Sequence, residues 1–189
     1  MSDAVDKVRR RLLHAAACLQ SAGIPYAVIG GNAVAAWVSR VDEAAVRNTR
    51  DVDLLLRKED LPRAIAAMEQ AGYVHRRVAS LGSGGSMDVF LEGAGGKVRD
   101  AVHIILAGEP IRPDAPVTHE DVDDSEDAGG FRLISLSALV RMKLAAWRDK
   151  DRMHLRDLQS VGLLENAAMP GLPPLLQERL EFIVENPED

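Results

Sequence analysis

The chain has one cysteine, few aromatic residues, no long apolar run and no excess of basic residues. A single cysteine, Cys18, excludes an internal disulfide and a metal site built from several thiolates. No apolar stretch approaches the roughly 20 residues that a membrane-spanning helix needs. The formal net charge of -6 argues against a protein that coats nucleic acid non-specifically, because phosphate binding needs clustered lysine and arginine.

The remaining composition is that of an ordinary globular protein. Hydrophobic residues make up 47% of the chain and charged residues 28%, and 189 residues can build one domain, with or without an appendage. The N-terminal segment carries charged residues from its first positions and has the apolar repeat of a helix, unlike a signal peptide. We therefore expect a cytoplasmic protein that does not interact with a membrane.

The stretch 26–56 carries most of the chemistry. A short run rich in β-branched and aromatic residues, Tyr26–Ile29, stops at Gly30 and Gly31, and Asn32 opens an alanine-rich helical segment. This pattern predicts a strand that enters a helix through a glycine turn. Glycine lets a ligand approach the backbone closely, and the free N–H groups at a helix start favour phosphate.

Two acids begin the next apolar run. Asp51 and Asp53 are two residues apart, so in a strand their carboxylates point to the same face. Such carboxylates repel each other unless a cation lies between them, and oxygen-rich sites suit Mg²⁺ or Mn²⁺. The alternative is a strand edge with solvated acids, but the leucines that follow place the pair at the mouth of a buried strand. The turn and the acids together predict a metal and triphosphate site.

These residues resemble a known family. Gly30-Gly31-Asn32, a spacer, and Asp51-Val52-Asp53 resemble the signature of the DNA polymerase β-like nucleotidyltransferases. The pattern Arg47-x-Thr49-x-Asp51 is similar to the branch that contains the AbiEii-type toxins and related small bacterial enzymes. The resemblance covers roughly residues 20 to 75, with a weaker similarity from 134 to 158.

The resemblance implies an α+β nucleotidyltransferase fold, in which helices flank a small mixed β-sheet and a helical appendage follows. We expect a nucleotidyltransferase-like core over residues 1–133 and a C-terminal helical region over residues 134–189. Asp51 and Asp53 would be catalytic and would hold Mg²⁺ or Mn²⁺. Gly30, Gly31 and Asn32 would bind the phosphates of a nucleoside triphosphate.

One position departs from the family pattern. These enzymes usually place a third carboxylate on a later strand, and here His103 stands where that acid is expected. An imidazole can ligate the metal, serve as the base for an incoming hydroxyl, or be a buried structural residue. Asp88, Asp100 and Glu109 are nearby acids that could substitute, although strand parity puts Asp100 on the face opposite His103. The sequence leaves these alternatives open.

Four basic or polar residues are further candidates. Lys143 and Arg148 belong to a segment that resembles the basic pattern found after the core in AbiEii-like proteins, which implies contact with nucleotide phosphates or with the acceptor. The alternative is a helix surface braced by ion pairs. Arg47 and Thr49 precede the acids closely and can donate hydrogen bonds to phosphate.

The rest of the chain is expected to alternate helices and strands. Apolar spacing predicts helices over residues 4–22, 58–71, 135–144, 151–161 and 173–184, and strands at 87–91 and 98–106 that pair as an antiparallel hairpin. The glycine- and serine-rich stretch 79–86 is interpreted as a flexible turn. Residues 108–130, with their prolines and acid run, are interpreted as a surface linker with little intrinsic order.

The expected activity is metal-dependent transfer of a nucleoside monophosphate from a nucleoside triphosphate to a hydroxyl, on an RNA such as tRNA, on a protein or on a small molecule. A second hypothesis is the toxin of a toxin–antitoxin pair, with an antitoxin as partner, which would transfer a nucleotidyl or phosphoryl group. A third is a nucleotide-binding module that has lost catalysis with the third acid.

Overall fold

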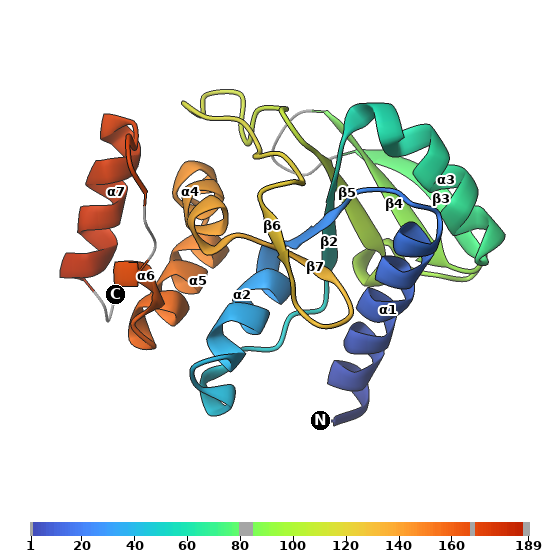
Figure 1. The fold of residues 1–189 in the computed structure, drawn as a ribbon, viewed down its shortest axis with the longest axis horizontal. Coiled ribbons are helices and arrows are strands. Elements are labelled where there is room, and N and C mark those ends of the chain that lie inside the picture. Colours follow the sequence, from blue (N-terminus) through green and yellow to red (C-terminus); the bar gives the residue numbers. More distant parts are fainter. Residues whose placement is uncertain (1, 80–84, 167–168, 187–189) are drawn as a thin grey trace.

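A computed structural model describes residues 2–79, 85–166 and 169–186 (Figure 1). The helices are α1 (Ser2–Ser21), α2 (Gly30–Ser39), α3 (Leu61–Gln70), α4 (Leu136–Ala146), α5 (Asp149–Ser160), α6 (Leu163–Asn166) and α7 (Pro174–Glu185). The strands are β1 (Ala27–Ile29), β2 (Val52–Leu56), β3 (Tyr73–Ala79), β4 (Ser86–Glu92), β5 (Val102–Leu106), β6 (Ser125–Asp127) and β7 (Arg132–Ile134). Short 3-10 turns lie at Glu43–Ala45, Lys58–Asp60 and Val98–Asp100.

The seven strands form one sheet in the order β3-β4-β5-β2-β1-β7-β6. The β2–β5 and β1–β7 pairs are parallel, and the other neighbours are antiparallel. The sheet is therefore mixed and helices flank it, which confirms the expected α+β architecture.

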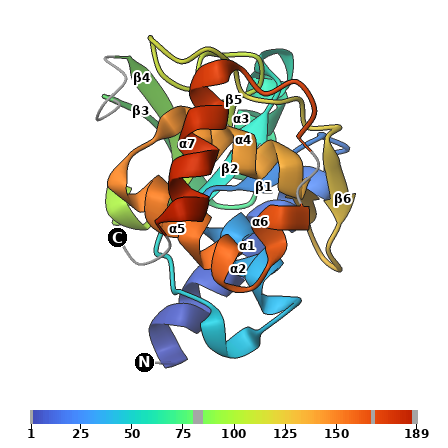
Figure 2. The same cartoon turned by 90° about the vertical axis from the view of Figure 1, so that its left-hand side faces the viewer.

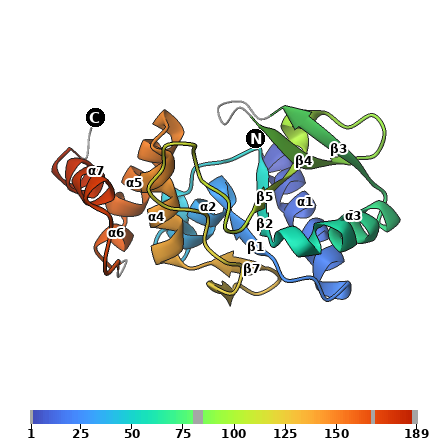
Figure 3. The ribbon, with the colours of Figure 1, turned by 90° about the horizontal axis from the view of Figure 1, so that it is seen from above.

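The two faces of the sheet are covered by different helices (Figures 1 and 3). Alternate residues of the central strands, among them Val28 and Leu54, pack with α1 and α3 in one hydrophobic cluster. Their neighbours Ile29 and Leu55 pack on the opposite face in a second cluster, which also contains residues of α2, α4, α5 and α7. The alternation follows from the two-residue repeat of a strand.

Most of the local predictions are confirmed. The helix expected over residues 4–22 is α1, and β1 enters α2 directly at Gly30. The Ser135 hydroxyl accepts a hydrogen bond from the Ala138 N–H, so Ser135 is the N-cap of α4. The predicted hairpin partners β4 and β5 are antiparallel, although a 3-10 turn occupies residues 98–100 and β5 begins only at Val102.

Three strands were not predicted. β3 is an edge strand whose sequence YVHRRVA places histidine and arginines between its apolar residues, so it lacks a clear two-residue repeat. β6 and β7 span three residues each, too few for a pattern to show. Of the stretch 79–86, interpreted as a flexible turn, residues 80–84 lie outside the part that the structure describes.

The interpretation of residues 108–130 as a linker with little order was wrong. Val122 is buried in the core. The acid run is tied to distant basic residues, since Asp121 pairs with Arg57 at 2.5 Å and Glu120 pairs with Arg141 at 2.5 Å. These contacts come from residues far away in the sequence, so local composition does not reveal them.

Among the described residues, no helix is both long and apolar enough to span a bilayer.

Candidate active site

The candidate site lies where β1 ends, β2 begins and α2 starts. The antiparallel register pairs Ile29 with Asp53, so the end of β1 lies beside the first residues of β2. Gly30 follows at once with φ +68°, in the left-handed region that favours glycine. A Cβ on Gly30 would lie 2.0 Å from Oδ2 of Asp53, so the carboxylate oxygen occupies the place that any side chain at this position would need.

The second glycine and the asparagine also contact the segment that carries the acids. A Cβ on Gly31 would lie 2.8 Å from the Thr49 hydroxyl oxygen. The Asn32 side-chain amide donates a hydrogen bond of 2.5 Å to the backbone carbonyl of Asp51. The structure thus brings the glycine turn, the start of α2 and the Thr49–Asp53 segment together.

His103 lies beside Asp53 on the same face of the sheet. The parallel pairing of β2 and β5 places the two residues opposite each other. Nδ1 of His103 is 3.3 Å from Oδ1 of Asp53, and Nε2 is 3.2 Å from the Val98 carbonyl oxygen. Since both neighbours are acceptors, the protonated imidazolium satisfies both contacts as a donor.

The pKa of His103 is raised and that of Asp53 is lowered, the directions expected of an ion pair. The hydrogen bond to Asp53 raises the pKa of His103 above its ordinary value, although burial acts in the opposite direction. Burial alone would raise the pKa of Asp53, but the bond and charge of His103, with the charges of Lys143 and Lys150, hold it below its ordinary value. The Asp53 carboxylate is therefore ionised and lies in a positive field.

The acids that could have replaced the third carboxylate point elsewhere. Asp88 pairs with Ile104, not His103, so it lies on the opposite face, where its carboxylate bonds His75 at 2.7 Å and Arg77 at 3.1 Å. Asp100 lies 3.6 Å from Arg99 and Glu109 lies 3.9 Å from Lys58. His103 is the side chain that the structure sets against Asp53.

Lys143 faces the site from α4 but is held by an acid. Its buried ammonium donates to Oδ1 of Asp151 at 2.9 Å, and Nε of Arg148 donates to Oδ2 of the same residue at 2.6 Å. Burial lowers the pKa of Lys143 against the opposing effect of Asp151. Burial would raise the pKa of Asp151, but Lys143 and Arg148 hold it low, so the carboxylate is ionised.

Arg47 is directed away from the acids. Its Nε donates to Oδ1 of Asp157 at 2.7 Å, on the side of α5 that faces α7. Thr49, two residues later, remains beside Gly31. The structure therefore gathers Gly30, Gly31, Asn32, Thr49, Asp51, Asp53 and His103 into one place, with Lys143 and Arg148 joined through Asp151, and leaves Arg47 apart.

Two residues of α5 that lie near the site were not predicted as site residues from the sequence. Asp151 anchors Lys143 and Arg148, and only its spacing of three residues from Arg148 could have signalled that role. His154 carries a buried Nδ1 without a hydrogen-bond partner among the described residues. Burial, followed by the charge of Lys143, lowers the pKa of His154 to about 4, which leaves a neutral imidazole near the site.

The residues present suit a divalent metal that arrives with a nucleotide. Within the described part of the chain, no three His, Cys, Asp or Glu side chains form a ready-made metal cluster. Mg²⁺ is commonly held by one or two carboxylates together with substrate phosphates, and not by a cage made of protein alone. Asp51 and Asp53 would supply such a pair, and Oδ2 of Asp53 lies against Gly30 at the start of α2.

A comparison with protein families identifies the chain. The model of a family described as uncharacterised nucleotidyltransferases matches residues 5–124. The protein belongs to that family. The matched stretch includes the glycine turn, Asp51, Asp53 and His103. No curated protein matches the sequence.

Solved structures share the fold of this nucleotidyltransferase-family chain. One is the crystal structure of an antigenic nucleotidyltransferase-like protein from Paracoccidioides brasiliensis, at 21% identity and a TM-score of 0.59, covering 97% of this chain and 89% of that one. Another is the solution structure of the antibiotic-resistance factor ANT(2'')-Ia, at 17% identity and a TM-score of 0.50, covering 95% and 90%. At these identities the likeness shows the fold alone.

Proposed function

We propose that this protein is a metal-dependent nucleotidyltransferase that moves a nucleoside monophosphate from a nucleoside triphosphate to a hydroxyl acceptor. The observation that carries the proposal is the contact between the glycine turn and the acids. The Asp53 carboxylate packs directly against Gly30, and Thr49 packs against Gly31, at the start of α2. Triphosphate, metal ligand and helix start then share one small volume.

In the proposed reaction the acceptor oxygen attacks the α-phosphorus. The bond from that phosphorus to the oxygen that bridges it to the β-phosphorus breaks, and pyrophosphate leaves with the bonding electron pair. The acceptor hydroxyl gives its proton to a base, either solvent water or His103 once that residue is neutral. Mg²⁺ or Mn²⁺ bound by Asp51 and Asp53 would neutralise charge on the phosphates.

The chain's own groups take distinct roles in this proposal. Gly30, Gly31 and the first N–H groups of α2 bind the terminal phosphates, while Asn32 fixes the backbone of Asp51. His103 holds the orientation of Asp53 through Nδ1; to serve as the base it would have to lose its proton and one of its two hydrogen bonds. Lys143 supplies positive charge from α4, and Arg148, whose side chain is 55% exposed, can extend to a phosphate.

We also propose that two parts of the chain have separate roles in the reaction. Residues 1–133 would bind the metal and the triphosphate, and residues 134–189 would add the cations of α4 and α5. Arg47, which the structure pairs with Asp157, would join the phosphates only if it left that partner.

The acceptor separates the candidate functions. An acceptor on tRNA or on a protein would fit the toxin of a toxin–antitoxin pair, as the resemblance to the AbiEii branch implies. A small-molecule hydroxyl is a second candidate acceptor, proposed only by analogy with the antibiotic-resistance factor ANT(2'')-Ia, which shares the fold. A nucleotide-binding module without turnover is the third candidate, because His103 occupies the place of the usual acid.

The experiment is to incubate the protein with each α-labelled triphosphate and Mg²⁺, in the presence of total cellular RNA, protein extract or a panel of hydroxyl-bearing small molecules. The proposal predicts label on one acceptor class and equimolar pyrophosphate. A γ-labelled triphosphate run in parallel detects phosphoryl transfer, and metal-dependent binding without any transfer would identify a non-catalytic module.

A further inference from the structure

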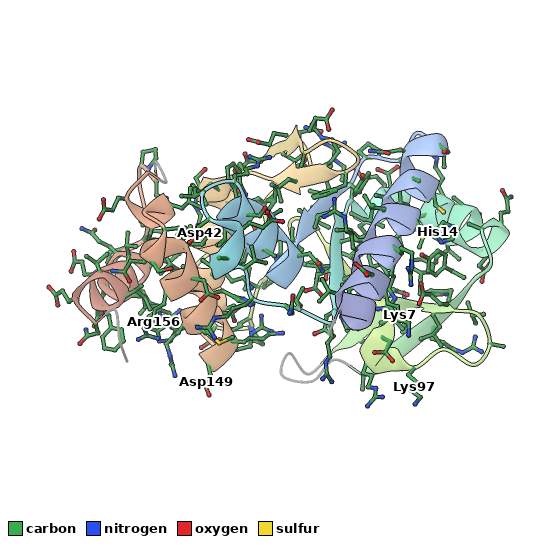
Figure 4. The ribbon with its side chains drawn as sticks, turned by 90° about the horizontal axis from the view of Figure 1, so that it is seen from below. Lys7, His14, Asp42, Lys97, Asp149 and Arg156 are labelled. Carbon is green, nitrogen blue, oxygen red and sulfur yellow. The ribbon has the colours of Figure 1, made fainter. Side chains whose placement is uncertain are left out.

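A groove separate from the acids lies between α5 and α7, at the end of the molecule that faces the viewer in Figure 2. It has a volume of about 1090 Å³. Asp149 and Arg156, labelled in Figure 4, belong to its α5 wall, at the end of the molecule opposite His14 and Lys97. The Arg47–Asp157 ion pair also lines it. No role in the proposed reaction accounts for this groove.

The groove gathers exposed apolar side chains. Met153, Leu175 and Phe182 line it and are 38%, 41% and 42% exposed. Seven large hydrophobic residues of the described chain are exposed, and these three with Val184 make four of them, all on α5 and α7. Single exposed apolar residues are ordinary, but a group of them in a groove marks a binding surface.

The groove also carries two guanidinium groups without a carboxylate partner among the described residues. Nε of Arg156 donates to the Asn186 carbonyl, and Nη1 of Arg179 donates to the carbonyls of Leu144 and Ala145. By contrast, Arg152 pairs with Asp149 at 2.6 Å. Guanidinium groups outside ion pairs, beside apolar side chains, complement a ligand that presents carboxylates and apolar groups together.

The lining disfavours nucleic acid. The Trp147 ring is already approached by Arg152 and Arg179, whose guanidinium carbons lie 5.7 and 5.2 Å from its centroid, and by the edge of Phe182. It therefore offers little free surface on which a base can stack. Asp149, Asp157 and Glu178 also line the groove, and the first two are paired with Arg152 and Arg47.

A second copy of the chain is a poorer match than an acidic partner. Each copy would bring the same two unpaired guanidinium groups to a two-fold contact. Only Glu178, among the lining acids, has no ion pair within the described residues. In a two-fold contact, the two guanidinium groups of each copy would therefore find one unpaired carboxylate, that of Glu178, on the other copy.

We propose that the groove between α5 and α7 is a docking site for an acidic amphipathic helix of another protein. Its apolar side chains would contact Met153, Leu175 and Phe182, and its carboxylates would bind Arg156 and Arg179. Two helices that wall a groove accept a third helix by packing of side-chain ridges, and an apolar centre with arginine and aromatic residues is typical of a protein interface. The proposal does not depend on the transfer reaction.

The test selects binders from a displayed library of random peptides of about 16 residues, roughly four helical turns, on the full-length protein. Labelled selected peptides are then titrated by fluorescence anisotropy. The groove variants are Phe182→Ser and Arg156→Glu. The matched controls are Val41→Ser, at a valine that is 56% exposed outside the groove, and Arg10→Glu on exposed α1 surface. Thermal melts confirm that all four variants fold.

The proposal predicts selected peptides with leucine-like residues at three- and four-residue spacing and with flanking Asp or Glu. Each groove variant should weaken their binding by about tenfold or more, and each control by less than about twofold. No enrichment of acidic amphipathic peptides, or equal loss in groove and control variants, would overturn it. Self-association of the protein in sedimentation would also overturn the proposal if Phe182→Ser abolished it. Tighter binding of a single-stranded RNA oligonucleotide than of any peptide would overturn it too, if that binding depended on the groove.

Discussion

Replacing Gly30 by alanine should disable the candidate site by displacing one carboxylate. The added Cβ would lie 2.0 Å from Oδ2 and 2.8 Å from Cγ of Asp53. An ordinary contact begins near 3.4 Å, so the carboxylate oxygen must retreat by at least about 1.4 Å. That movement breaks the 3.3 Å contact between Asp53 and His103.

The expected magnitudes follow from two separate costs. Alanine in the left-handed region costs roughly 1–2 kcal/mol of stability, and Gly30 has φ +68°. Loss of a hydrogen bond between charged groups adds about 1.5–3 kcal/mol, part of which solvent recovers because both side chains remain partly exposed. For activity, a misplacement of about 1 Å in a catalytic group is worth about 100-fold in rate.

Gly23→Ala is the matched control. Gly23 has φ +62°, but a Cβ added there would meet no atom within 4 Å, so the substitution carries the conformational cost alone. Chemical denaturation and Mg²⁺-dependent nucleotide binding are measured on both variants. We expect Gly30→Ala to be the less stable by about 1 kcal/mol or more and to lose binding that Gly23→Ala keeps. Equal stability and intact binding in both would refute the close approach of Gly30 to Asp53.

Three further predictions concern buried or paired charges. Asp151→Asn should cost about 3–5 kcal/mol of unfolding free energy, because the Lys143 ammonium stays buried without its counter-charge, and Lys143→Met in the same chain should recover part of that loss in urea titrations. His119 and His154 have pKa values lowered to about 4 from 6.5, mainly by burial, so the stability they contribute is complete above pH 6.5. It should fall as the pH drops toward 4, by on the order of 3 kcal/mol for each histidine, and a flat acid limb in denaturation curves would contradict this. His103→Asp should lower the melting temperature in metal-free buffer by setting two carboxylates side by side, and Mg²⁺ should raise it more than in the parent; equal shifts would speak against a metal at Asp53.

The sequence predicted elements whose signals are local. Tyr26–Ile29 followed by two glycines defined the β1–α2 junction, since a β-branched run and a glycine turn require no distant partner. The apolar spacing over residues 135–144 located α4 in the same way. The long helix α1 followed from its three- and four-residue repeat.

Elements that depend on distant partners were not predicted. β7 is three residues long and forms a strand by parallel pairing with β1, more than a hundred residues earlier. β3 is stabilised by its antiparallel partner β4, while its own residues are mixed in polarity. The segment 108–130 resembles a linker in composition, yet ion pairs to Arg57 and Arg141 fix it in place.

The same distinction applies to the site. Asp51 and Asp53 could be identified because a period of two and the neighbouring leucines suffice. Whether Asp88 or His103 would face Asp53 depended on the register of β5 against β2 and β4, which only the folded sheet defines. Arg47 was grouped with the acids by sequence proximity, but its partner Asp157 is 110 residues away.

The central claim is that Asp53 and Asp51 bind a divalent metal together with a nucleoside triphosphate. The most direct measurement is calorimetric titration of the parent, Asp51→Asn, Asp53→Asn and the control Glu109→Gln with a non-hydrolysable triphosphate, with and without Mg²⁺. We predict Mg²⁺-dependent binding that both aspartate variants lose by about tenfold or more and that Glu109→Gln retains. Binding that needs no metal, or that survives Asp53→Asn unchanged, would contradict the account.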